Sequence, residues 1–152
     1  MKVREIMTSD IAAVAPDTSV NAIAGLMDRR GISGVPVVDE KGHVVGIVSE
    51  LDLIVRNARL EPPIFFQVLD GRIPLETPGH YRKRLQHMLG TQARDVMTEK
   101  VLTVPPDEDV ETLAELMVKK RVNPVPVVEG DRLVGIVSRA DIIRMMARDL
   151  PD

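Results

Sequence analysis

The chain has 152 residues, no cysteine and a formal net charge of −3, and it is 44% hydrophobic but only 2% aromatic. This length suits one ordinary domain, and the aliphatic content offers enough burial to argue against a disordered chain. The lack of cysteine excludes disulfide frameworks, thiolate zinc sites and cysteine catalysis, the slight negative charge argues against nucleic-acid binding, and no apolar run approaches the about 18 residues of a membrane span.

The first part of the chain predicts the element order β-α-β-β-α. A short extended run over Ile11–Ala15 is followed by Asp17 and Thr18, which have the chemistry of a helix N-cap. Apolar residues then recur at helical spacing, at Val20, Ile23, Ala24 and Met27. The segments VPVV and VVGIVS are apolar on both faces and predict two buried strands, joined by a hairpin turn over residues 40–43. A closing helix is expected after Ser49.

A connector over residues 58–92 separates this part from the rest of the chain. It holds all three aromatic residues, Phe65, Phe66 and Tyr81. Pro78 and Gly79 introduce an expected amphipathic helix with Leu85, Met88 and Leu89 on one face. Because disordered linkers rarely concentrate aromatic residues, we expect residues 63–90 to be ordered and partly helical, with Phe65 and Phe66 packed against the repeats or a dimer partner. His80 and His87 lack a third ligand at suitable spacing, so no metal site is expected.

The last part of the chain repeats the first. Met97 matches Met7 and, after a one-residue deletion in the second hairpin turn, Asp141 matches Asp52. The extended run over Val101–Val104, N-cap candidates, a helix, two strands and a closing helix recur in the same order. The second N-cap candidates are Asp107 and Asp109, the helical apolar residues are Val110, Leu113, Ala114 and Met117, and the closing helix follows Ser138. The chain is therefore a tandem duplication, with repeats over 1–57 and 93–152 that are each too small to form a sufficient core alone.

Each repeat contains the pattern G-I-V-S-x-x-D where its last strand meets its last helix. Ser49 with Asp52, and Ser138 with Asp141, have the spacing of a helix capping box. The same geometry suits a ligand, because a helix N-terminus attracts phosphate and a carboxylate accepts hydrogen bonds from the hydroxyls of a ribose. The local pattern alone leaves both interpretations open.

The doubled unit resembles a pair of CBS domains, the regulatory repeats named after cystathionine β-synthase, also called a Bateman module. The resemblance rests on the early [V/I]-x-T-V-x-P-D pattern, the central h-P-V-V-[D/E] and the late G-h-h-S-x-x-D, and it covers both repeats. It implies an α/β (α+β) fold in which the repeats pack through their sheets with pseudo-two-fold symmetry and leave two clefts. In that family the clefts often hold AMP, ADP, ATP or S-adenosylmethionine, with the late Asp on the ribose and the late Ser near the phosphate.

Carried over residue by residue, the resemblance assigns two sets of ligand-binding residues, each drawn from both repeats. One cleft would combine Ser49, Asp52, Leu102, Thr103, Asn123 and Val125, and the other Ser138, Asp141, Ala12, Ala13, Ser33 and Val35. Because Ala13 stands where the second repeat has Thr103, the cleft of Asp52 is expected to bind its ligand more strongly.

The resemblance implies a stand-alone regulatory module without catalytic residues or catalytic cofactor. It would sense adenylate or S-adenosylmethionine levels, and so the energy state, and report them to an unidentified partner protein. An alternative is a ligand-free oligomerisation or protein-interaction module. A nucleotide hydrolase is disfavoured, because the chain has no P-loop and no histidine beside the expected clefts.

Partners and location follow from the same features. We expect a homodimer, because CBS pairs commonly dimerise and because the helical faces at Leu26, Met27, Leu116 and Met117 exceed the needs of one core. No nucleic-acid or membrane partner is expected. The first residues lack the apolar segment of a signal peptide, so the expected location is cytoplasmic.

Overall fold

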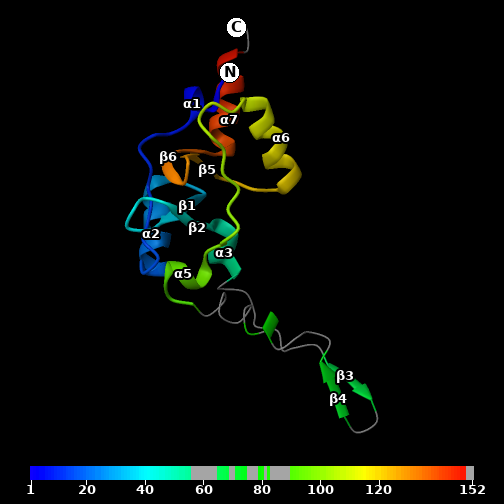
Figure 1. Ribbon diagram of the computed structural model, residues 1–152. Coiled ribbons are helices and arrows are strands. Elements are labelled where there is room, and N and C mark those ends of the chain that lie inside the picture. The colour runs from blue at the N-terminus through cyan, green and yellow to red at the C-terminus, as the bar shows by residue number, and fades with distance from the viewer. Residues whose placement is uncertain (56–64, 69–70, 75–78, 81, 83–89, 150–152) are drawn as a thin grey trace.

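A computed structural model describes residues 1–55, 65–68, 71–74, 79–80, 82 and 90–149 (Figure 1). The elements occur in the order α1 (Val3–Ile6), α2 (Val20–Arg30), β1 (Gly34–Val38), β2 (Val44–Ser49), α3 (Glu50–Val55), β3 (Phe65–Val68), β4 (Gly71–Pro74), α5 (Ala93–Val96), α6 (Val110–Lys120), β5 (Val125–Glu129), β6 (Arg132–Val137) and α7 (Arg139–Asp149). The two long helices, the two hairpins and the two closing helices expected for the repeats are present, which confirms the mixed α/β fold. No helix in these residues is long and apolar enough to cross a bilayer.

The long helix of each repeat packs one apolar stripe into the core. In α2 the buried residues are Val20, Ile23 and Met27, and in α6 they are Val110, Leu113 and Met117. The N-cap of α2 is Ser19, whose side chain accepts a hydrogen bond from the Ala22 N–H at 3.1 Å. The sequence-based choice of Asp17 and Thr18 was wrong, because the Thr18 hydroxyl oxygen instead accepts from the Ala15 N–H in the preceding turn. The N-cap of α6 is Asp109, which is one of the two residues expected there.

The two hairpins of the repeats are antiparallel and equivalent. Val35 pairs with Val48 in β1–β2, and Val125 pairs with Val137 in β5–β6. Both turns contain a glycine at positive φ, Gly42 at 80° and Gly130 at 62°, a conformation that other residues rarely adopt. The hairpins therefore form where the continuous apolar runs and the turn residues predicted them.

The expected first strand of each repeat is only a single bridge. Val14 pairs in parallel with Val37, and Val104 pairs in the same way with Val127. Proline residues follow directly on this run in both repeats, at Pro16 and at Pro105. Because proline lacks the N–H that a ladder requires, the extended run stops after one pair.

The short segments that open each repeat are exchanged between the repeats. Val3 in α1 is fully buried in the core of the second repeat, beside Leu113 and Val125. Conversely, Ala93 and Val96 in α5 are fully buried in the core of the first repeat. Neither repeat therefore has a complete core without the arm of the other, which agrees with the small size of each unit.

The exchanged arms also extend the hairpins. Thr8 exchanges two backbone hydrogen bonds with Ile136 of β6, at 2.9 and 3.0 Å, and Thr98 exchanges two with Ile47 of β2, at 2.9 and 3.0 Å. This pairing brings each Met-Thr dipeptide beside the G-I-V-S segment of the other repeat. A side chain on Gly135 would collide with the Met7 side chain, which explains the glycine at that place.

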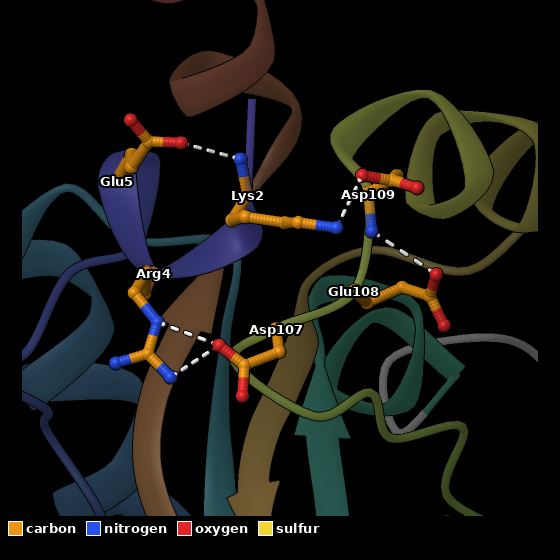
Figure 2. A network of polar contacts seen from close by, with 6 residues as sticks. All are labelled: Lys2, Arg4, Glu5, Asp107, Glu108 and Asp109. Carbon is orange, nitrogen blue, oxygen red and sulfur yellow. Dashed lines mark hydrogen bonds and ion pairs between the residues drawn. The ribbon is translucent and has the colours of Figure 1, made fainter.

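The first arm is further held by charged groups (Figure 2). The Lys2 ammonium donates to Asp109 Oδ1 at 2.8 Å, and Arg4 donates from Nε to Asp107 Oδ1 at 2.9 Å. The hydrogen bond from Lys2 lowers the pKa of Asp109 below its ordinary value of 3.8, and that same bond raises the pKa of Lys2 above 10.5. These pairs are exposed, so they orient the arm more than they stabilise the fold.

A dimer was expected from the sequence partly on the premise that the long helices carry spare apolar residues, and that premise was wrong. Met27 and Met117 are only 6% and 8% exposed, and Leu26 and Leu116 pack against the same two cores. These side chains are needed within one chain and do not form a spare apolar surface.

The connector contains a feature that the sequence analysis did not anticipate. Strands β3 and β4 form an antiparallel hairpin, with Phe66 opposite Ile73, and Figure 1 shows it apart from the two repeats. Residues 79–80 and 82 are helical, while the expected helical face at Leu85, Met88 and Leu89 lies outside the described residues. The packing of the Phe65 and Phe66 side chains likewise lies outside the described part of the chain.

Candidate functional site

The N-terminus of the closing helix has the same polar arrangement in both repeats. In the first repeat, Asp52 Oδ2 accepts from the Ser49 N–H at 2.8 Å and from the Ser49 hydroxyl at 3.0 Å. In the second, Asp141 Oδ2 accepts from the Ser138 N–H and hydroxyl at the same two distances. Both aspartates are only 7% exposed. One carboxylate oxygen of each aspartate therefore caps its helix, as the capping-box interpretation expects.

The second carboxylate oxygen has a different partner in each repeat. Asp52 Oδ1 accepts from the Thr98 hydroxyl at 3.4 Å, a long hydrogen bond. Asp141 Oδ1 accepts from Arg144 Nη1 at 2.9 Å, as part of an ion pair within α7. The two sites are thus equivalent in their helix cap, and an ion pair within α7 adds to the cap at Asp141.

A cavity of about 830 Å³ lies between the repeats beside α7. Its walls include five of the residues assigned from the sequence, namely Ala12, Ser33, Asn123, Ser138 and Asp141. The first repeat thus provides one wall and the N-terminus of α7 the other, as the resemblance implied.

A smaller cavity of about 280 Å³ lies beside the N-terminus of α3. Ser49, Leu102 and Asn123 line it, again from both repeats. Asp52 does not line this cavity, but it is bonded to two residues that do, Ser49 and Thr98.

The other assigned residues lie outside both cavity walls. Val35 and Val125 are fully buried in β1 and β5, where they belong to the two cores. Ala13 is exposed and Thr103 is half-buried, and neither lines a cavity. The Thr103 hydroxyl lines neither cavity, and the relative strength of the two clefts stays a prediction.

The two cavities share a wall at the centre of the molecule. Asn123 donates from Nδ2 to the Ser33 hydroxyl oxygen at 3.1 Å, and its Oδ1 accepts from the Arg139 N–H at 2.9 Å. All three residues line both cavities, as does Glu50. Residues from the two repeats therefore meet between the cavities.

Basic side chains line both cavities. Lys100, Arg121 and Arg139 surround the smaller one with Glu50 as the single acid. The larger one holds Arg30, Arg139 and Arg144 together with Asp10, Asp28, Glu50 and Asp141. Helix N-termini, arginines and a buried carboxylate suit a ligand that carries both an anionic group and hydroxyls. Neither lining contains a histidine, so the described residues offer no obvious general base of that type.

Several residues of these cavity walls were not among those assigned from the sequence, among them Thr8, Thr98, Arg139 and Arg144. Thr8 and Thr98 reach the cavities only because the arms are exchanged, although their Met-Thr dipeptides do recur ninety residues apart. Arg144 stands three residues after Asp141, a spacing that places two side chains on one face of a helix. That spacing was the available signal for the ion pair.

Comparisons with known proteins agree with this architecture. A family model described as the CBS domain matches residues 3–58 and 93–148. An uncharacterized protein of Methanocaldococcus jannaschii, MJ1426, is 33% identical over 96% of this chain and 91% of its own length. Other relatives are longer, and the chain spans 62% of one and 32% of another.

Solved structures resemble the whole fold. The crystal structure of CBSX2 in complex with AMP matches with a TM-score of 0.82 at 24% identity, over 99% of both chains. The CBS domain pair of MJ0100, in complex with 5′-methylthioadenosine and S-adenosyl-L-methionine, matches with a TM-score of 0.71 at 25% identity, over 99% of this chain and 98% of that one.

Proposed function

The chain belongs to the CBS domain family, and from that premise we propose that it is a regulatory module that binds an adenosine-containing ligand between its two repeats. The observation that carries the proposal is the buried Asp141 carboxylate, bonded to Ser138, in the wall of a cavity of about 830 Å³ that also holds three arginines. Related CBS pairs are known with AMP and with S-adenosylmethionine, which supports this ligand class.

The chemistry of the larger cavity fits the parts of such a ligand. Asp141 provides a carboxylate for ribose hydroxyls, and the N-terminus of α7 with Arg139 provides positive potential for a phosphate. Ile11, Ala12 and Ile32 provide apolar surface for an adenine ring. For the two clefts together, we propose the twelve residues assigned from the sequence as the ligand-binding set. Val35 and Val125 act within it by supporting the cavity walls.

The proposed role is regulatory and not catalytic. A ligand that contacts both repeats changes their equilibrium arrangement only if it binds one arrangement more tightly, and the surface shown to a partner protein changes with it. The energy state of the cytoplasm is the signal we propose, and the repeats 1–57 and 93–152 are the two moving units.

Titration calorimetry of the purified chain with AMP, ATP and S-adenosylmethionine tests this function. Binding of at least one of them, with a matching rise in the unfolding temperature, is the expected result. No binding of any of the three, together with no nucleotide released on denaturing the purified protein, would leave the ligand-free interaction module as the better description. Incubation with ATP should yield no product.

We also propose that the chain forms a homodimer through its closing helices. Leu51 and Ile54 on α3, and Ile143 and Met146 on α7, are each 57% to 72% exposed. Large apolar side chains gathered on two equivalent helices are typical of an interface. Sedimentation at roughly ten micromolar should show a dimer, Ile54→Glu should weaken it, and Val118→Glu on the exposed face of α6 should not. A monomer at that concentration would contradict this part of the proposal.

A further inference from the structure

We propose that Arg144 makes the larger cleft selective for adenosine ligands that carry an anionic 5′ group. This inference rests on the proposed function and goes beyond it by naming the residue that sets the ligand preference. It starts from the two hydrogen bonds that Ser138 donates to one oxygen of Asp141 and the one that Arg144 donates to the other.

The hydrogen-bonding capacity of Asp141 is nearly filled. An ionised carboxylate accepts about four hydrogen bonds, two on each oxygen. Ser138 fills both places on Oδ2 with its N–H and its hydroxyl, and Arg144 fills one of the two on Oδ1. One acceptor position remains on Oδ1, whereas the two hydroxyls of a ribose need two. A ribose therefore binds fully only when the Arg144 guanidinium leaves Oδ1.

The free energy needed to move the Arg144 guanidinium away from Asp141 Oδ1 depends on the ligand. The Asp141 side chain is 8% exposed and that of Arg144 is 59% exposed, so the arginine is free to turn while the carboxylate is fixed. With a neutral nucleoside, the guanidinium exchanges a carboxylate for water and gains nothing. With a 5′ phosphate in the same cavity, it gains a second charge-assisted partner.

The other arginines of the larger cavity are less suited to this role. Arg30 pairs with Asp10 at 3.5 Å, away from Asp141. Arg139 is shared with the smaller cavity. The residue that corresponds to Arg144 in the first repeat is Val55, which cannot donate a hydrogen bond from its side chain.

The test compares AMP with adenosine, which differ only in the 5′ phosphate. Calorimetric titration of the full chain measures both affinities in the wild type, in Arg144→Met and in Arg144→Lys. The ratio of AMP to adenosine affinity should fall about tenfold in Arg144→Met, because AMP loses a charged partner while adenosine gains a place on Asp141. Arg144→Lys should retain most of the ratio.

Arg148→Met is the matched control. It removes the same charge from the same helix one turn further on, at an exposed position outside both cavity walls. It should leave the ratio unchanged. A ratio that is equal in the wild type and in Arg144→Met, with both ligands still bound, would overturn the role of Arg144 and leave the proposed function standing. A wild type that binds neither ligand would overturn the proposed function and this inference with it.

Discussion

Asp141 is the residue at which helix capping and ligand binding can be separated experimentally. Asp141→Asn preserves the size of the side chain and one carbonyl oxygen, which can still accept from the Ser138 N–H that Asp141 Oδ2 now accepts at 2.8 Å. The amide NH₂ then replaces the oxygen that faces Arg144 and the cavity. A donor thus stands where a ribose hydroxyl requires an acceptor.

The structure sets the expected magnitudes. The retained cap limits the loss of stability to about 1 kcal/mol, the usual scale for a weakened helix cap. The ion pair with Arg144 adds little, because the arginine side chain is 59% exposed. A hydrogen bond to a charged group contributes about 1.5–3 kcal/mol, so the affinity of the larger cleft for AMP should fall at least tenfold.

Calorimetric titration with AMP and thermal unfolding of the same samples measure the two effects. Asp149→Asn, at the exposed end of the same helix, is the control for the loss of one negative charge. Asp52→Asn should leave binding in the larger cavity unchanged, because Asp52 does not line it. If Asp141→Asn lowers the unfolding temperature but leaves AMP binding intact, Asp141 is only a cap and the assignment to the ribose is wrong.

Three further predictions concern the exchanged arm. Val3→Ala removes two methyl groups from a fully buried side chain and should lower the free energy of unfolding by about 2 kcal/mol, measured by denaturant titration. Gly135→Ala would place a Cβ 2.5 Å from Met7 Sδ and should cost about 1–3 kcal/mol in the same assay, and an unchanged stability would show that the arm does not pack there. Because the Asp109 carboxyl has a lowered pKa in the folded state, its contribution is present above an unfolded pKa near 3.8 and is lost as the pH falls through the lower folded pKa. Lys2→Met should therefore move the pKa of Asp109 back toward 3.8, as measured by NMR titration of the carboxyl group, with little change in stability because the pair is exposed; an unchanged pKa of Asp109 would contradict the pairing.

The fold class and the repeat were predictable because their signals are local or are copied within the chain. The spacing of Ile23 and Met27 has a helical period, and the apolar runs flanking Gly42 predict a hairpin, whatever surrounds them. The duplication doubled each signal, and the helix cap at Ser138 follows from four neighbouring residues.

The candidate site could be predicted only in part. The pattern around Ser138 and Asp141 identified the residues at the helix N-terminus, and the resemblance placed Ser33 opposite them. The resemblance assigned Thr103 to a cleft, and it lines neither cavity; an extended run has two faces, and the sequence does not say which one lines a cavity.

The way in which each repeat covers the core of the other could not be predicted from the sequence. The sequence by itself determined two copies of one β-α-β-β-α unit, each too small to bury its own apolar faces. Whether Val3 fills the core of its own repeat or of the other depends on contacts between residues a hundred positions apart. Such contacts produce no periodic pattern in the sequence. The exchange of arms, the unequal cavities and the pairing of Arg144 with Asp141 arise from that packing, because near-identical motifs acquire different neighbours once the copies are folded together.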